Sequence, residues 1–327
     1  MLLSTARIRT THVGSLPRTA PVVQQLYKKD KGEAVDLAVF NEAMREATVE
    51  VVKRQLAVGI DQVSDGEVSK VGYSTYMQDR LSGFGGHTDR KPSLDLKDYP
   101  EFRKKMALLT GPQEFRRASC TGPIAIKDRA PLQHDLANFA NALKVTGAGE
   151  GFMTAASPGV VSAFQPNAFY PTHEAYVEAI GAAMKEEYEA IVRAGFVLQV
   201  DCPDLAMARH TGFQDLTEAE FLKRAAYQVE VLNAALANIP ATSVRMHICW
   251  GNYEGPHDYD IDLVKVLPIV LRAKPHAISF EASNPRHEHE WVIWKEAKLP
   301  DDKVLIPGVL DTSTNFVEHP ELVAQRL

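Results

Sequence analysis

The stretch Arg245-Met246-His247-Ile248-Cys249-Trp250-Gly251-Asn252 alternates polar and apolar side chains, and a period of two is typical of a β-strand. On a strand, His247 and Cys249 point to the same face as Arg245, whereas the apolar residues between and after them point to the opposite face. A parallel barrel needs this pattern, because helices cover its outside while its interior accommodates polar groups. The stretch therefore predicts a barrel strand whose inner face carries a histidine and a cysteine.

Short apolar runs alternate with amphipathic helical stretches along the whole chain, which is the signature of parallel βα units. The predicted strands are Thr11–Leu16, Ile60–Glu67, Ala118–Ile124, Phe152–Pro158, Phe196–Asp201, Val244–Trp250, Ala277–Ser283 and Val304–Asp311. The clearest predicted helices are Val35–Ala57, Glu174–Ala194, Glu218–Ala237 and Leu263–Ala273. Eight strands predict an α/β fold of the (β/α)8 TIM-barrel type, and 327 residues suit a single such domain over residues 1–327.

Details of the sequence refine this prediction. Thr217 with Glu220 forms a capping box, and Thr172 is placed to cap the helix that follows it. The segment Gly83–Glu114 breaks the rhythm with glycine, proline and mixed charge, and is expected to be an elaborated loop or lid. The last helical pattern stops at Leu327 after barely two turns, so we expect the domain to be cut short at its C-terminal end.

Composition favours a soluble, cytoplasmic protein. Hydrophobic residues make up 45% and charged residues 24% of the chain, close to the averages for globular proteins. Lys plus Arg number 36 against 42 acidic residues, and without a long basic run nucleic acid is not an expected partner. No stretch approaches the length of a membrane span, and three dispersed cysteines argue against a disulfide framework. A homo-oligomer is left open.

His247 and Cys249 gain a third candidate partner in Glu281. By the same alternation, Glu281 points inward from the next predicted strand, because Ile278 and Phe280 take the apolar side. Imidazole, thiolate and carboxylate suit zinc, which would lower the pKa of a bound thiol substrate. The alternative is a buried free cysteine beside a hydrogen-bonded core histidine.

Two carboxylates end other predicted strands. Asp201 faces inward at the carboxyl end of its strand, where barrel active sites lie, whereas Cys202 falls on the outer side and is not a first-choice ligand. Asp65 and Glu67 are placed similarly. Such carboxylates suit a substrate ammonium group; the alternatives are a helix cap for Asp201 and a solvated turn for the other two.

Weaker signals are interpreted as structural. The run Arg286-His287-Glu288-His289-Glu290 is rich in ligand types, but it opens a helical stretch and is expected to form a solvated face. Cys120 is expected in the core. The sequence has no Gly-x-Gly-x-x-Gly element, Walker loop or nucleophile elbow, so dinucleotide, ATP and α/β-hydrolase functions lack support.

Taken together, these motifs resemble the catalytic half of cobalamin-independent methionine synthase and its short relatives. The resemblance rests on the ordered motifs Thr11–Arg18, Asp65–Glu67, Gln199–Asp201, His247-x-Cys249 and Glu281. It implies that zinc is held by His247, Cys249 and Glu281 plus a cysteine on the last strand, which has no counterpart here. It also implies that Ser15, Glu67 and Asp201 bind the amino-acid part of homocysteine, and that methyltetrahydrofolate is a candidate methyl donor.

This sequence differs from the family pattern in ways that leave two alternative functions open. Ser313 occupies the place of a family histidine thought to pass a proton to the leaving group, and serine is a poor general acid. One rival is an epoxyalkane:coenzyme M transferase-like reaction, in which the thiol opens an epoxide; a carboxylate pair suits an amino acid better than a sulfonate. The other is a catalytically idle zinc-binding barrel.

Overall fold

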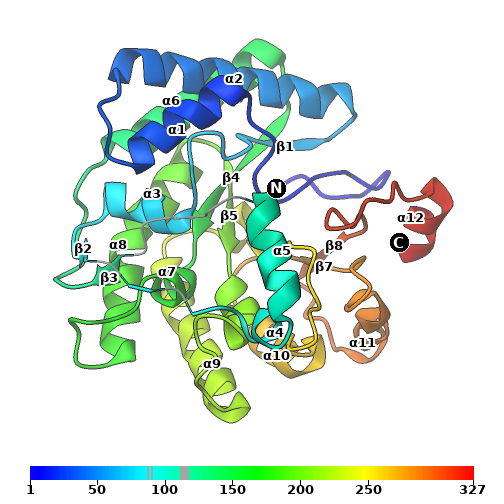
Figure 1. The fold of residues 1–327 in the computed structure, drawn as a ribbon. Helices are drawn as coiled ribbons and strands as arrows, with labels where there is room; N and C mark the ends of the chain where they lie inside the picture. The colour runs from blue at the N-terminus through cyan, green and yellow to red at the C-terminus, as the bar shows by residue number, and fades with distance from the viewer. Residues whose placement is uncertain (87, 90, 111–117) are drawn as a thin grey trace.

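The computed structural model describes residues 1–86, 88–89, 91–110 and 118–327. Within these residues, the centre of the molecule is a curled sheet of six parallel strands (Figure 1) in the order β1-β4-β5-β6-β7-β8. The strands are β1 (Gln62–Ser64), β4 (Glu150–Ala156), β5 (Val197–Asp201), β6 (Val244–His247), β7 (Ala277–Glu281) and β8 (Val304–Gly308). The first predicted strand is present as a single parallel bridge between Thr11 and Gln62.

Helices surround this sheet (Figure 1), and α2 packs against α6 while α9 packs against both α8 and α10. Their bounds are α1 (Ala20–Asp30), α2 (Leu37–Ala57), α3 (Tyr73–Arg80), α4 (Leu94–Asp98), α5 (Pro100–Thr110), α6 (Ala130–Thr146), α7 (Pro158–Phe164), α8 (His173–Arg193), α9 (Glu218–Ala235), α10 (Leu263–Val270), α11 (Trp291–Glu296) and α12 (Pro320–Arg326). Short 3-10 turns are η1 (Pro203–Leu205), η2 (Met207–Arg209), η3 (Ala241–Ser243) and η4 (Glu288–Glu290). The four predicted helices are confirmed, as are the Thr217–Glu220 capping box and the Thr172 cap.

The prediction of Ala118–Ile124 as a barrel strand is wrong. Only β3 (Ser119–Cys120) is extended there, and it pairs antiparallel with β2 (Phe84–Gly85) outside the parallel sheet. The strand cannot continue because Gly122-Pro123 follows after Thr121, and proline has no N–H to donate to a ladder. Gly83 turns the chain at φ +87°, and a Cβ there would lie 2.7 Å from the carbonyl oxygen of Gly122.

The segment predicted as a loop or lid contains β2, α4 and α5, whereas its residues 87, 90 and 111–114 lie outside the described residues. Several contacts hold it against the loops that follow β5 and β6. Leu94 N donates to the carbonyl oxygen of His210 at 3.0 Å, and Tyr99 Oη donates to Asp258 at 3.2 Å. A role as a lid stays a prediction.

The strand predicted over Val244–Trp250 ends at His247 in the structure, but the predicted alternation of buried apolar side chains continues beyond it. Met246, Ile248 and Trp250 are buried within the main hydrophobic cluster, which fills the space around the sheet. Cys120 and Cys202 are buried in the same cluster, as predicted. The polar side of β6 therefore faces away from this apolar layer.

Arg245 is fully buried on that polar side and connects several strands. It donates to Gln199 Oε1 (2.7 Å), Thr11 Oγ1 (2.9 Å), Gln62 Oε1 (2.5 Å) and the His12 carbonyl oxygen (2.9 Å). Its guanidinium carbon also lies 3.5 Å from the ring centre of Phe152 on β4. One cationic side chain thus joins β6 to β5, β4, β1 and the segment around Thr11.

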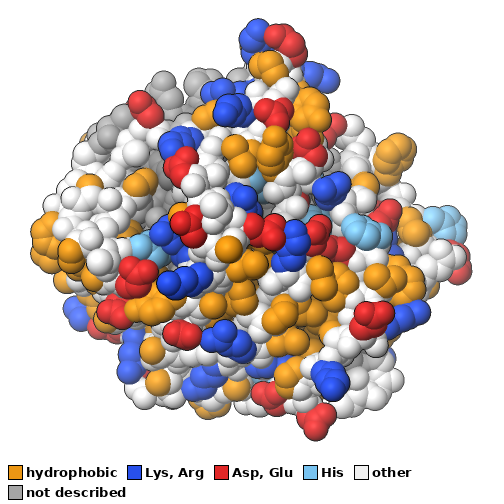
Figure 2. Space-filling model, turned by 90° about the horizontal axis from the view of Figure 1, so that it is seen from below, with side chains coloured by type: hydrophobic (Ala, Val, Ile, Leu, Met, Phe, Trp, Pro, Cys, Tyr) orange, Lys and Arg blue, Asp and Glu red, His pale blue; other side chains and the backbone are white. Residues whose placement is uncertain are grey.

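The outer surface is mixed in charge. On the face in Figure 2, basic and acidic side chains are interspersed among apolar ones, in keeping with the net charge of −6. Among the described residues, no helix combines the length and apolar character needed to cross a membrane.

We expect Arg245→Met to lower the free energy of unfolding by about 3 kcal/mol or more, because it leaves buried amide, hydroxyl and carbonyl acceptors without a donor. Urea unfolding followed by circular dichroism measures this change. Arg54→Met is the matched control: Arg54 pairs only with Glu50 on the exposed side of α2, so we expect a loss of about 0.5 kcal/mol. Equal losses in the two variants would contradict the role given to Arg245.

Candidate functional site

A strained turn follows β1 and carries two of the predicted site carboxylates. Gly66 has φ +64° and Glu67 has φ +54°, a left-handed conformation that is uncommon for a residue with a side chain. Asp65 Oδ1 accepts from Glu67 N at 3.0 Å, and Arg18 Nη2 donates to the Glu67 and Lys70 carbonyl oxygens at 2.6 Å each. The surrounding structure therefore stabilises a turn that fixes the direction of the Glu67 side chain.

The structure brings the predicted residues Ser15 and Glu67 together. Ser15 Oγ donates to Glu67 Oε2 at 2.7 Å, which leaves Oε1 of the same carboxylate to be accounted for. That oxygen is buried and has no hydrogen-bond partner among the described residues. A buried carboxylate oxygen without a donor is costly, so this position favours binding a cationic or hydrogen-bonding ligand.

Asp201 ends β5 in the electrostatic neighbourhood of Glu67. It is 5% exposed, and Gln199 Nε2 donates to its Oδ1 at 2.7 Å. Burial raises the pKa of Asp201 well above its usual range, the charge of Glu67 raises it further, and Lys70 and Arg245 oppose the rise. A cation that binds near both groups would favour the ionised form of Asp201.

His247 ends β6, and its backbone register places it between two other predicted site strands. It aligns with Asp201 on β5 and with Ser279 on β7. Burial, reinforced by the charge of Arg245, lowers the pKa of His247 to about 4, so the imidazole is neutral at physiological pH. Its Nδ1 is buried without a hydrogen-bond partner among the described residues, and a neutral imidazole nitrogen is a metal ligand type.

Cys249 and Glu281 each lie two residues beyond the aligned pair His247 and Ser279; Cys249 follows the end of β6, and Glu281 ends β7. Burial raises the pKa of the Cys249 thiol to about 12, and the charges of Asp201 and Glu281 add to the rise. Glu281 Oε1 accepts hydrogen bonds from Ser283 N (2.7 Å), Ser283 Oγ (3.1 Å) and Asn284 N (2.9 Å). The described part of the chain holds no cluster of three or more His, Cys, Asp or Glu side chains arranged to bind a metal ion.

A cavity of about 290 Å³ adjoins these strand ends. Its wall includes Met207, whose backbone N donates to the carbonyl oxygen of Cys249 at 3.1 Å. It also includes Asp204, which is 2% exposed and accepts from Ser157 Oγ at 2.5 Å. Burial raises the pKa of Asp204 to about 7. The cavity thus has an apolar wall and three aspartates in its lining, of which Asp204 is buried.

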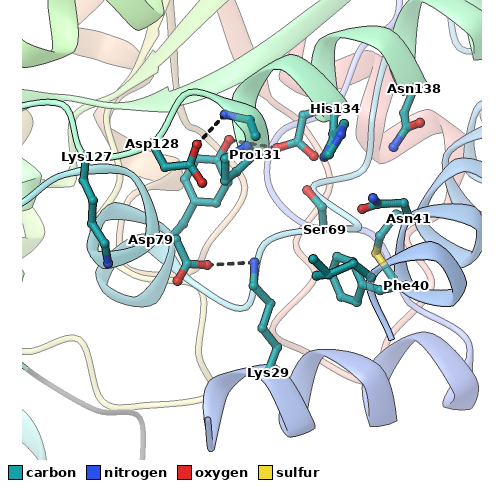
Figure 3. A pocket seen from close by; sticks show the side chains of 15 residues that line it. Lys29, Phe40, Asn41, Ser69, Asp79, Lys127, Asp128, Pro131, His134 and Asn138 are labelled. Carbon is teal, nitrogen blue, oxygen red and sulfur yellow. Dashed lines mark hydrogen bonds and ion pairs between the residues drawn. The ribbon is translucent and has the colours of Figure 1, made fainter. Parts of the chain in front are cut away.

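A second cavity, of about 340 Å³, lies among α1, α2, α3 and α6 (Figure 3). Lys29 pairs with Asp79 across it at 2.8 Å, and His134 and Asn138 line it from α6. None of the six predicted site residues lines either cavity, so we assign the candidate site to the strand ends on the contacts described above.

The prediction of a solvated face for Arg286–Glu290 is wrong for two of its members. His287 and Glu290 are 3% and 5% exposed, whereas Arg286, Glu288 and His289 are exposed. His287 Nε2 lies 2.8 Å from Asp260 Oδ2 and its Nδ1 lies 2.9 Å from Glu290 Oε2, so the ring is stabilised between two carboxylates. The reasoning from sequence also missed Asp204, Lys70 and Asp260, and only the position of Asp204 soon after a strand end gave a usable signal.

Comparisons with known proteins give one consistent result. The family model described as "Cobalamin-independent synthase, Catalytic domain" matches residues 8–327. A methionine synthase of Sulfolobus acidocaldarius is 27% identical over 323 residues, which cover 97% of this chain and 79% of that protein. A methionine synthase of Saccharolobus solfataricus is 26% identical over 318 residues, covering 96% and 80%.

A solved structure shares the fold. The B12-independent methionine synthase from Shewanella sp. W3-18-1, in complex with selenomethionine, superposes with a TM-score of 0.64 at 18% identity, over 90% of this chain and 77% of that one. With the curled parallel sheet, this likeness confirms the predicted α/β barrel class.

We expect Asp204→Asn to stabilise the protein above about pH 5. The pKa of Asp204 is higher in the folded than in the unfolded chain, so the wild type loses stability as the pH rises from about 4 to 7, and the amide variant does not. Urea unfolding at several pH values should give a gap on the order of 2–4 kcal/mol at pH 8 that vanishes below pH 4. Asp215→Asn is the control, since Asp215 lines the same cavity but is exposed. A pH-independent gap for Asp204→Asn would contradict the burial of an acid with a raised pKa.

Proposed function

Because this chain belongs to the cobalamin-independent synthase catalytic-domain family, and the resemblance found in its sequence is thereby confirmed, we propose that it is a zinc-dependent, cytoplasmic methyltransferase that methylates homocysteine to methionine. The family match supports a methyltransferase of the methionine synthase type. The acceptor, the metal and the site residues are our proposal. The observation that carries it is the pair of buried carboxylates of Glu67 and Asp201.

This pair suits the ammonium group of an amino acid. Glu67 Oε1 is buried without a partner among the described residues, and Asp201 is held in place by Gln199. An ammonium group donates three hydrogen bonds and carries the positive charge that both carboxylates favour. Ser15, hydrogen-bonded to Glu67, orients the carboxylate and completes the binding position. An α-amino acid with a thiol side chain would thereby present its sulfur toward the ends of β6 and β7.

The residues proposed to hold zinc there are His247, Cys249 and Glu281. They supply the nitrogen, sulfur and oxygen donors that zinc accepts, and the neutral His247 ring needs no proton removed before it binds. When bound, the metal lowers the pKa of a thiol and so supplies a thiolate at neutral pH. The three protein donors leave a coordination position for the substrate sulfur.

We place the methyl donor in the cavity beside Cys249. Met207 lines this cavity, and its backbone N donates to the carbonyl oxygen of Cys249, which supports a placement near the proposed metal ligands. Its apolar side chains suit the pterin ring system of a donor such as methyltetrahydrofolate, and the Asp204 carboxyl suits hydrogen bonds with the ring nitrogens. Ser313, in contrast, hydrogen-bonds to Asp311 Oδ1 at 2.7 Å and has no acidic proton to give at neutral pH.

We expect Glu67→Gln and Asp201→Asn each to raise the KM for homocysteine at least tenfold, because each removes half of the charge that binds the ammonium group. Steady-state assays that follow methionine by mass spectrometry test this, with methyltetrahydrofolate and an epoxide supplied in separate reactions. Asp79→Asn is the control, because Asp79 lies in the separate cavity of Figure 3. Unchanged KM values in both site variants, or a product formed only from the epoxide and coenzyme M, would favour the transferase rival.

We expect Cys249→Ala to abolish zinc binding at equimolar metal while leaving most of the fold, because the hydrophobic layer around the sheet supplies the stability. Metal analysis after dialysis and circular dichroism measure the two effects. Cys202→Ala is the matched control, since Cys202 is buried on the outer side and should leave the zinc content unchanged. Wild-type zinc content in Cys249→Ala, or complete unfolding of that variant, would refute the assignment; zinc binding without any methyl transfer would support an idle barrel.

A further inference from the structure

A buried polar cluster joins three loops at the carboxyl end of the sheet. Its centre is Asp260, which is 8% exposed and lies in the loop after β6. Its Oδ2 lies 2.7 Å from His257 Nδ1 and 2.8 Å from His287 Nε2. Its Oδ1 lies 3.1 Å from His210 Nδ1, an ion-pair contact outside hydrogen-bond geometry. The three histidines are 1–3% exposed, so the whole cluster is excluded from water.

The three histidines come from three different loops. His210 follows η2 after β5, His257 lies between β6 and α10, and His287 lies between β7 and η4. These are the loops that leave the strands carrying Asp201, His247 and Glu281. Burial raises the pKa of Asp260, but its contacts with the histidines more than offset burial and hold that pKa below its usual range. One ionised carboxylate therefore connects the loops behind all the proposed ligands.

A second carboxylate extends the cluster to α10. Glu290 Oε2 lies 2.9 Å from His287 Nδ1, and its Oε1 accepts from Leu263 N at 2.7 Å, at the start of α10. Both ring nitrogens of His287 thus face carboxylate oxygens, which permits only one orientation of the ring. His287 lies between two carboxylates, and Asp260 Oδ2 lies between two histidines, so the centre of the cluster is held from more than one side.

Trp250 connects this cluster to Cys249. The Trp250 and His287 rings are 4.3 Å apart between centroids with an interplanar angle of 34°, and Trp250 Nε1 donates to the Ile261 carbonyl at 2.7 Å. Trp250 is the next residue after Cys249, and its side chain is 2% exposed. The ring is therefore fixed from two sides by the loop and cluster around Asp260, and the adjoining Cys249 backbone is fixed with it.

We propose that Asp260 is a positioning residue that acts through His287 and Trp250 to hold the Cys249 thiol in place at the ends of β6 and β7. The inference deepens the proposed function, because it concerns the residue assigned there as the sulfur ligand. Asp260 itself touches neither substrate nor metal. If Cys249 is held in position before the metal binds, less side-chain conformational entropy is lost on binding.

The test measures the accessibility of the Cys249 thiol in the metal-free, substrate-free full chain. Asp260→Asn and His287→Gln are treated with a maleimide at fixed pH, and the rate at each cysteine is read by peptide mass spectrometry. We expect both variants to label Cys249 at least tenfold faster than the wild type, while Cys120 and Cys202 keep their rates. Zinc affinity, measured by competition with a chelator, should fall tenfold or more.

Glu187→Gln is the matched control, since Glu187 forms an equally buried ion pair with Arg80, between α8 and α3, remote from the three loops. We expect it to lower stability but to leave Cys249 labelling within twofold of the wild type. The proposal is overturned if both cluster variants leave Cys249 labelling unchanged, if Glu187→Gln accelerates it equally, or if both cluster variants fail to fold while Glu187→Gln folds. Because the labelling measurement uses metal-free and substrate-free protein, a missing methyl transfer would contradict the proposed function and not this inference.

Discussion

The position of one buried guanidinium governs the interior of the sheet. Arg245 has no exposed surface, and its donors are used on Gln199, Thr11, Gln62 and a backbone carbonyl. A buried cation is stable only when nearby acceptors bind it, and Arg245 makes four hydrogen bonds, so the segments that supply these acceptors must keep a fixed register. Through Gln199, which also donates to Asp201, the same contact orients a residue of the proposed substrate site. The fold and the proposed site are therefore connected through one series of hydrogen bonds, from Arg245 through Gln199 to Asp201.

The proposed site gathers features that cost stability in the folded chain. Glu67 has a left-handed backbone and a carboxylate oxygen without a partner among the described residues, and Asp201 is an acid whose pKa is raised by burial. His247 adds a buried ring nitrogen, Nδ1, that also has no hydrogen-bond partner among the described residues. Unfavourable groups gathered at the carboxyl ends of parallel strands are typical of a site that a ligand completes. A substrate ammonium group and a metal ion would satisfy them together.

The local sequence pattern was sufficient to predict an element and its orientation wherever one face of that element is buried. The alternation from Val244 to Trp250 fixed both faces of β6, because a shift by one residue would expose its apolar side chains. The prediction of a barrel strand over Ala118–Ile124 failed because Gly122-Pro123 ends the extended segment, and because its pairing partner, β2, lies in an irregular part of the chain. The environment of His287 could not be predicted, since its burial depends on Asp260 from another loop and a one-dimensional pattern does not report contacts between loops.

The central claim is that Cys249, with His247 and Glu281, binds a zinc ion that receives the sulfur of an amino-acid thiol. X-ray absorption spectroscopy at the zinc edge of the zinc-loaded protein measures this most directly. The account predicts one sulfur neighbour alongside nitrogen and oxygen donors, and one additional sulfur after homocysteine is added. Zinc surrounded only by nitrogen and oxygen, or a sulfur count that homocysteine leaves unchanged, would contradict it.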